Sequence, residues 1–211
     1  MPLEPLPRGA TLTGSLPTLE ARRDFTVTLR AGEALRIDVE QVDLDLLLEV
    51  RPPGDAEAIR VDSWAQSWGT ESLCTVAQQG GDFRVHLGSG DISPRGRFRL
   101  RARVREATPD DRLCAAATRA HADAFALASP ALPIDEVGRA FEAAASLWRQ
   151  QGDVYQEALL WQRLAALYNS RGEVEGEIAR LRAARRLLDG ETDRIIEWAQ
   201  VTADLSHALL R

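Results

Sequence analysis

Apolar and polar residues alternate along most of residues 1–107. The alternation is regular in five runs: Phe25, Val27 and Leu29; Leu35, Ile37 and Val39; Leu46, Leu48 and Val50; Phe83, Val85 and Leu87; and Phe98, Leu100, Ala102 and Val104. A period of two places one face of a strand on a core and the other in water. Turns over 30–33, 51–55, 78–82 and 88–96 separate these runs, and weaker strands are predicted over 10–16, 58–62 and 72–77. Seven or eight short strands with such turns indicate an antiparallel β-sandwich.

The chain changes character at residue 108, where glycine and proline become rarer and alanine dominates. Thr108 suits the N-cap position, Pro109 suits the first helical position, and Asp111 can complete a capping box. Helices are predicted over 109–128, 134–151, 154–170, 173–188 and 192–210, and three of them end at a glycine: Gly152, Gly172 and Gly190. The sequence therefore predicts an α+β protein with an antiparallel β-sandwich over 1–107 and TPR-like antiparallel helical hairpins over 108–211.

The helical part carries a repeat signal. The turn at Gly152-Asp153-Val154, with Glu157 after it, is echoed by Gly172-Glu173-Val174 and Glu177, and Trp161-x-x-Leu164-Ala165-x-x-Tyr168 matches the pattern of a TPR helix. A looser echo occurs at Trp198-x-x-Val201. Ordinary amphipathic helices in a bundle are the alternative. If the hairpins are TPR-like, Gln162, Ala166 and Asn169 line a concave face that binds an extended peptide or a partner helix.

The charge balance argues against several classes of partner. The net charge is −6, and an acidic balance disfavours nucleic acid and anionic membranes, which require clustered cations. All 26 basic residues are arginine, so chemistry that needs a lysine, such as a Walker A motif or a Schiff base, is excluded. No signal peptide or membrane-spanning apolar run is expected. Two cysteines, Cys74 and Cys114, fall in different predicted domains and form no disulfide framework, so we expect reduced thiols and a cytoplasmic protein.

The order of several short motifs resembles a known bacterial arrangement. Four short motifs resemble the pre-peptidase C-terminal type of β-sandwich: Gly14-Ser15-Leu16, Asp24-Phe25, Ala31-Gly32-Glu33 and Gly81-Asp82-Phe83. Other segments are similar to bacterial proteins that continue through TPR repeats into a CHAT domain, a caspase-like protease module. These segments are the run 35–41, Gly96-Arg97-Phe98, the run 107–112 and Leu147-Trp148-Arg149-x-x-Gly152-Asp153. The resemblance implies a sensing or scaffolding arm, and the His-Cys dyad of a CHAT domain is not among these residues.

Three groups of residues are candidates for other chemistry. Cys74 and His86 could meet across neighbouring strands as nucleophile and base, although Cys74 equally suits a core position, and His86, His121 and His207 lack metal-ligand spacing. Asp43 and Asp45, with Glu40 and Glu49, could offer oxygen ligands to calcium, although a solvated strand edge is the better interpretation. Trp64 and Trp68 could stack on a sugar or hold a peptide, and core packing is the alternative.

These observations predict a non-enzymatic module that binds a protein partner, with a CHAT-type protease as one candidate, and that needs no cofactor, metal, nucleic acid or membrane. A carbohydrate- or matrix-binding sandwich is the alternative function, and a Cys74–His86 hydrolase is a third. The last predicted helix lacks an obviously polar outer face, so we expect a further helix or a partner to cover it.

Overall fold

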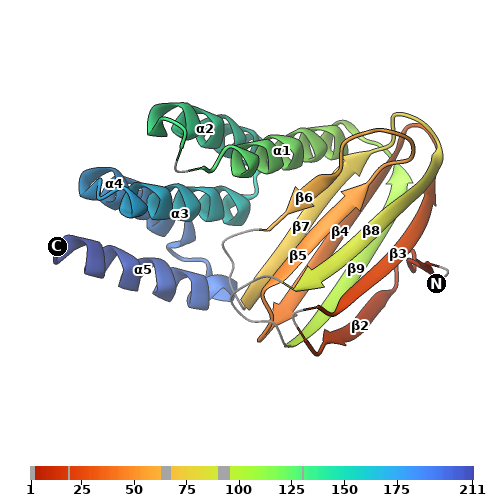
Figure 1. Cartoon of the computed structure of the whole chain (residues 1–211), viewed down its shortest axis with the longest axis horizontal. Helices are drawn as coiled ribbons and strands as arrows, with labels where there is room; N and C mark the ends of the chain where they lie inside the picture. Colours follow the sequence, from red (N-terminus) through yellow and green to blue (C-terminus); the bar gives the residue numbers. More distant parts are fainter. Residues whose placement is uncertain (1–2, 19, 63–67, 90–95, 130) are drawn as a thin grey trace. The chain divides into compact units, whose positions relative to one another are not determined.

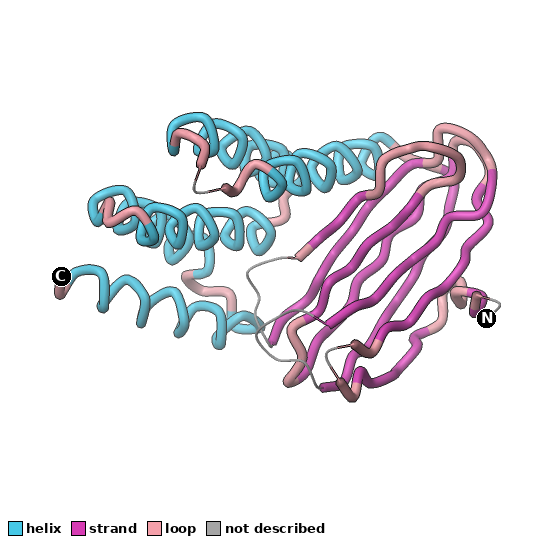
Figure 2. Tube along the Cα trace, viewed as in Figure 1, coloured by secondary structure: helices cyan, strands magenta, loops and turns pink. Residues whose placement is uncertain are grey.

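The computed structural model describes residues 3–18, 20–62, 68–89, 96–129 and 131–211. The chain forms two compact units, Met1–Thr118 and Arg119–Arg211. Antiparallel sheets make up the first unit and helices the second, as the alternating and helical patterns predict (Figures 1 and 2). Helix α1 (Pro109–Ala126) crosses the division between the units.

The first unit is a sandwich of two sheets. The five-stranded sheet has the order β1-β3-β8-β5-β6 and the four-stranded sheet the order β2-β9-β4-β7, with every pairing antiparallel except β1 with β3. The strands are β1 (Glu4–Pro5), β2 (Thr11–Leu16), β3 (Arg22–Leu29), β4 (Glu33–Val42), β5 (Leu46–Arg51), β6 (Ile59–Val61), β7 (Trp68–Val76), β8 (Gly81–Ser89) and β9 (Gly96–Glu106).

The alternating residues of the sequence form the sandwich core. Phe25, Leu48 and Val85 in the five-stranded sheet, and Ile37 and Leu100 in the four-stranded sheet, are fully buried. Because a strand turns successive side chains to opposite faces, the intervening residues of β9 point outward and are exposed. The five main runs of alternation are therefore confirmed as strands.

A reciprocal cap fixes the start of α1. The Thr108 hydroxyl accepts a hydrogen bond from the backbone N–H of Asp111 at 3.2 Å, and the Asp111 carboxylate accepts one from the N–H of Thr108 at 3.0 Å. Arg105, at the end of β9, adds a guanidinium bond to the same carboxylate at 2.8 Å. The predicted capping box is confirmed, and an arginine of the preceding strand strengthens it.

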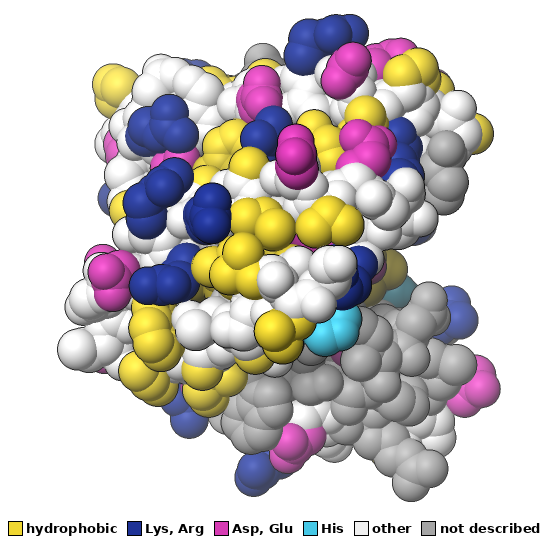
Figure 3. Space-filling model, turned by 90° about the vertical axis from the view of Figure 1, so that its left-hand side faces the viewer, with side chains coloured by type: hydrophobic (Ala, Val, Ile, Leu, Met, Phe, Trp, Pro, Cys, Tyr) yellow, Lys and Arg dark blue, Asp and Glu magenta, His cyan; other side chains and the backbone are white. Residues whose placement is uncertain are grey.

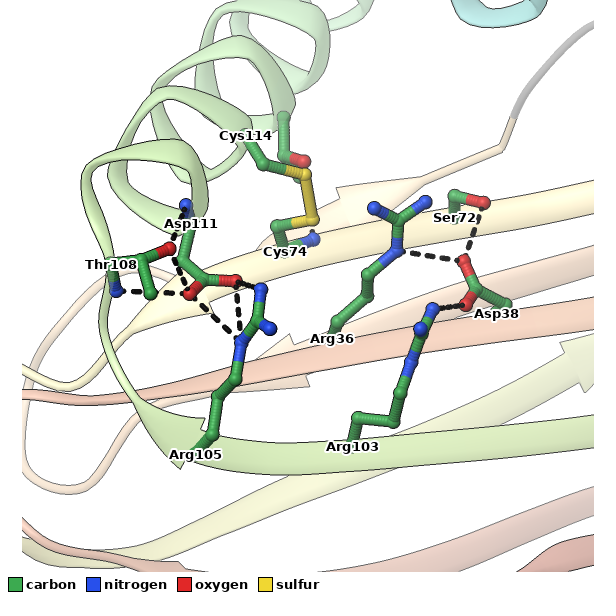
Figure 4. The surroundings of a disulfide bond; sticks show 10 residues. Arg36, Asp38, Ser72, Cys74, Arg103, Arg105, Thr108, Asp111 and Cys114 are labelled. Atoms are coloured by element: carbon green, nitrogen blue, oxygen red, sulfur yellow. Dashed lines mark hydrogen bonds and ion pairs between the residues drawn. A yellow bond between two sulfur atoms is a disulfide. The ribbon is translucent and has the colours of Figure 1, made fainter. Parts of the chain in front are cut away.

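A disulfide joins Cys74 of β7 to Cys114 of α1, with the two Cα atoms 5.7 Å apart (Figure 4). The prediction of two reduced thiols is wrong. The reason is that α1 does not leave the sandwich at residue 108: its first turns lie against the outer side of β7, where the Cys74 N–H also donates to the Thr118 hydroxyl at 3.2 Å. The cysteines therefore no longer support a reducing compartment, and a cytoplasmic location stays a prediction.

The second unit contains antiparallel helices joined by short turns. They are α2 (Ile134–Gln151), α3 (Val154–Ser170), α4 (Val174–Leu188), the 3₁₀ turn η1 (Thr192–Arg194) and α5 (Ile195–Leu209). Gly152 ends α2 in the left-handed conformation, with φ of 79°, as the glycine pattern predicts. Among the helices in the described part of the chain, none combines the length and apolar composition that crossing a bilayer requires.

The hairpin of α3 and α4 depends on a glycine. A Cβ at Gly176 would overlap the ring of Tyr168, the last aromatic residue of the repeat-like run in α3. The absence of a side chain at residue 176 therefore lets the tyrosine ring lie directly on the backbone of α4. Tyr168, the last residue of the TPR-like run in α3, therefore packs between the helices of this hairpin.

Candidate functional site

None of the fully exposed residues of α5 is Asp, Glu, Lys or Arg, although half-buried Asp204 accepts a hydrogen bond from Gln200 at 2.9 Å and exposed Arg211 follows the helix. Its exposed residues, which we call the α5 face, are Ile195, Ile196, Ala199, Gln200, Ala203, Ser206, His207, Leu209 and, just beyond the helix, Leu210. The large apolar side chains are strongly exposed, at 63% for Ile195, 57% for Ile196 and 88% for Leu210. The predicted absence of a polar outer face is confirmed.

The opposite side of α5 is ordinary helix packing. Val201, Leu205 and Ala208 are buried and pack toward α4. The start of the helix is held by Arg194, whose guanidinium lies 3.9 Å from the centre of the Tyr155 ring. The α5 face is therefore presented by a helix that is fixed on its inner side and uncovered on its outer side.

The outer faces of other helices in the same unit are charged. The exposed residues of α2 include Asp135, Glu136, Arg139, Glu142 and Arg149, and those of α4 include Glu175, Arg182, Arg185 and Arg186. In Figure 3, hydrophobic side chains gather at the level of α5, while arginine side chains are frequent above it. Charged outer faces are typical of helices that face water, so the α5 face differs from its neighbours in chemistry as well as position.

A shallow hollow of about 230 Å³ adjoins the α5 face. It lies where α4 ends and α5 begins, and its lining residues are Leu188, Asp189, Gly190, Glu191, Thr192, Ile195 and Trp198. A hollow of this volume, with an apolar wall and a polar rim, has room for a single side chain from another protein.

The residues predicted to line a concave face differ in exposure. Asn169 is exposed and its side-chain oxygen accepts a hydrogen bond from Arg211 at 3.0 Å, and Ala166 is half-buried. Gln162 is only 4% exposed, and its side-chain oxygen has no hydrogen-bond partner within the described part of the structure. A binding role for these three residues stays a prediction, with Asn169 the one that a partner could reach directly.

The two echoed turns each bury a glutamate against an arginine. Glu157 is held by Arg149, with one contact of 3.1 Å from Nε to Oε1, and Trp161 donates its indole N–H to the same oxygen at 3.3 Å. Glu177 is likewise bonded by Arg211. The repeated spacing of glycine and glutamate therefore marks two buried glutamates, each paired with a more exposed arginine, and these contacts hold helices together rather than bind a ligand.

The outer face of the four-stranded sheet carries a row of arginines. Arg97, Arg99, Arg101, Arg103 and Arg105 alternate along β9 and are all exposed. Asp38 on β4 accepts hydrogen bonds from Arg103 at 2.8 Å, Arg36 at 3.2 Å and Ser72 at 3.0 Å (Figure 4). Net charge averages this row away, so composition alone does not predict it. The signal that could have found it is the run Arg-x-Arg-x-Arg between the apolar positions of β9.

Two ionisable side chains in the structure have strongly shifted pKa values. Burial between the rings of Phe125 and Trp148 lowers the pKa of His121 to about 4. Burial acts to raise the pKa of Asp111, but the hydrogen bonds from Arg105 and Thr108 outweigh it and lower the pKa to about 2. Both groups belong to the packing of their units, so neither identifies a reactive site.

The residues of the other two candidate sites, the Cys74–His86 pair and the proposed calcium ligands, do not come together in the described structure. Cys74 lies in the four-stranded sheet within a disulfide, while His86 lies in the five-stranded sheet and bonds Asp24 at 2.7 Å, so the pair cannot act as nucleophile and base. Glu40 and Glu49 also belong to different sheets and contact Arg99 and Arg60, respectively. Within the described ranges, no three His, Cys, Asp or Glu side chains come together as metal ligands do.

Of the two tryptophan candidates, the structure describes only the backbone of Trp68. Trp64 lies outside the described residues. Trp68 begins β7, where its backbone pairs with Val42, and its side chain is not described. Binding of a sugar or matrix component by this pair stays a prediction.

Comparisons with known proteins give structural similarity alone. No protein-family model and no curated protein matches the chain. Among solved structures, the pre-peptidase C-terminal domain of a collagenase from Bacillus anthracis is 12% identical, with a TM-score of 0.41 over 48% of this chain and 95% of that one. PliG of Aeromonas hydrophila, a periplasmic inhibitor of g-type lysozyme, is 16% identical, with a TM-score of 0.36 over 46% and 85% of the two chains. The fold assignment therefore rests on the strand pairing described above.

Proposed function

We propose that the chain is a non-catalytic module that binds a partner protein through the α5 face of its helical unit. The observation that carries this proposal is the set of strongly exposed Ile195, Ile196, Leu209 and Leu210 on the α5 face, beside the charged outer faces of α2 and α4. Leaving Ile195, Ile196 and Leu210 in water is unfavourable by about 1.5–3 kcal/mol for each side chain that a partner could fully bury. An exposed apolar patch with a polar surround is typical of a protein-binding surface.

The partner that fits this surface is an amphipathic helix. Ala199 and Ala203 lie one turn apart on the α5 face and leave room for a second helix to approach closely, with Ile196 and Leu210 at the two ends. A helix that packs here would continue the antiparallel order of α3, α4 and α5, as the next helix of a TPR-like stack does. The resemblance of the sequence to TPR/CHAT proteins makes a CHAT-type protease the first partner to test.

The test is affinity capture with the whole chain as bait and a CHAT-type protease from the native host as the candidate, followed by titration of the purified pair. Ala203→Glu places a charge at the centre of the α5 face, and we expect it to abolish binding. Ala143→Glu is the matched control, because Ala143 is an exposed alanine on the outer face of α2. Circular dichroism establishes that both variants are folded.

Equal binding by the two variants would remove the α5 face from consideration. In that case the predicted concave face is tested by Asn169→Ala, which removes the exposed amide of α3 without a change in charge. Loss of binding in that variant alone would move the site from the exposed side of α5 to α3.

A further inference from the structure

The arginine row of β9 is aligned with hydroxyl groups on the neighbouring edge strand. In the register of β2 and β9, Ser15 lies opposite Arg97, Thr13 opposite Arg99 and Thr11 opposite Arg101. Paired residues of neighbouring strands point to the same face, and the exposed hydroxyls share the outer face with the arginines. Each of these three arginines therefore has a hydrogen-bonding side chain beside it.

The two ends of the row differ in how their charges are used. Arg105 is bonded to Asp111 in the first turn of α1, and Arg103 is bonded to Asp38. Arg97 and Arg101 form no ion pair within the described ranges, and Arg99 pairs with Glu40 at 3.2 Å, with both side chains about half-exposed or more. Exposed ion pairs of this kind contribute little stability and exchange readily with a competing anion. The open part of the row is thus Arg97, Arg99 and Arg101.

The surface over Arg97 and Arg99 is hollow. A depression of about 540 Å³ is lined by Thr13, Gly14, Ser15, Glu40, Val42, Arg97, Phe98 and Arg99. Val42, which pairs with Arg97 in the register of β4 and β9, supplies an apolar contact. The hollow therefore has cationic, hydroxyl and apolar walls, together with the Glu40 carboxylate that is paired with Arg99.

We propose that this face binds an extended acidic peptide segment whose carboxylates occupy every second position. Successive outward arginines on a strand are about 6.8 Å apart, which is the spacing of alternate side chains in an extended peptide. Carboxylates at three such positions can each meet one guanidinium, with charge-assisted hydrogen bonds. The intervening side chains point away, and the serine and threonine hydroxyls can bond the peptide backbone.

Charges next to the row favour a peptide over a phosphate polymer. Asp38 and Glu40 lie on β4, directly opposite Arg101 and Arg99 in the register. These two carboxylates lower the positive potential over the row, so they repel a polymer with a phosphate on every unit more than a peptide with only three carboxylates. This proposal concerns the sandwich unit and does not depend on the α5 face.

The test is a fluorescence-anisotropy titration of the whole chain with two labelled peptides of equal charge. One peptide has three glutamates that alternate with threonine, and the other has the three glutamates consecutively. We expect the alternating peptide to bind more tightly, and added salt to weaken its binding. Arg97→Gln with Arg101→Gln should raise its Kd about tenfold. Arg22→Gln with Arg84→Gln is the matched control, because it removes two exposed arginines from the five-stranded sheet.

Each other outcome overturns part of the proposal. Equal affinity for the two peptides would show that spacing is not recognised. Equal loss in both double variants would show that net charge alone drives binding. Tighter binding of labelled polyphosphate or single-stranded oligonucleotide than of the alternating peptide would assign the row to a phosphate polymer instead.

Discussion

Replacing Cys74 and Cys114 together with alanine should lower the free energy of unfolding of the sandwich unit. The disulfide connects residues separated by 40 positions in the sequence. Closing a loop of this length removes entropy from the unfolded chain that is worth about 4 kcal/mol at 25 °C in the chain-entropy model. A unit of this size is typically stable by about 5–15 kcal/mol, so the loss is a large fraction of the whole.

Urea unfolding followed by circular dichroism measures this loss, in the presence and absence of a thiol reductant. Both cysteines are buried, at 4% and 2% exposed, so the samples need to be unfolded and refolded in reductant for the bond to open completely. The reductant should move the midpoint of the wild-type chain to lower urea, to about the midpoint of the double variant. The double variant is its own control, because its midpoint should be the same with and without reductant.

Two results would contradict the reasoning. If the oxidised and reduced wild-type chains unfold within about 1 kcal/mol of each other, the loop is not constrained in the unfolded state as the model requires. If the double variant is much less stable than the reduced wild type, the packing of the two sulfur atoms matters more than the bond between them.

Three further predictions concern buried or tightly packed groups. Lowering the pH from 7 to 4 should destabilise the helical unit by about 3 kcal/mol, because His121 has a folded-state pKa of about 4 and binds a proton more readily when unfolded. Urea titrations of His121→Leu should lack that part of the pH dependence. Asp111→Asn should lower the free energy of unfolding of the sandwich unit by about 1–2 kcal/mol above pH 4. Acid titrations should show this difference vanish as the pH falls from 4 to 2, because the wild-type carboxylate, paired with Arg105, takes up its proton in that range. Gly176→Ala should lower the thermal midpoint by the equivalent of about 1–3 kcal/mol, since the overlap with Tyr168 exceeds the gain in helix propensity; an unchanged midpoint would show that the ring can move away.

Local patterns predicted most of the secondary structure. Alternation located the strands around Phe25, Ile37 and Leu100, because each strand has one face in a core and one in water. Capping chemistry located the start of α1 at Thr108, because a helix end must satisfy its free N–H groups from nearby residues. These are short-range requirements, and the sequence contains the residues that meet them.

Long-range packing was not predictable from the same patterns. The bond between Cys74 and Cys114 depends on how the first turns of α1 lie on β7, and neither segment specifies that contact by itself. Gln162 occupies a position that repeat geometry places on a surface, yet it is 4% exposed. The α5 face was predicted from the sequence because the spacing of apolar residues along a helix is itself a local property.

Strand β9 combines two incompatible chemistries in one stretch of backbone. Phe98, Leu100 and Ala102 are buried, while the arginines between them are exposed. Deleting a single residue within β9 would exchange the faces of every residue beyond it, placing guanidinium groups in the core and apolar side chains in water. Evolution can therefore replace Arg97 or Arg101, which form no ion pair within the described ranges, at little cost to folding, but it cannot change the length of the strand by one.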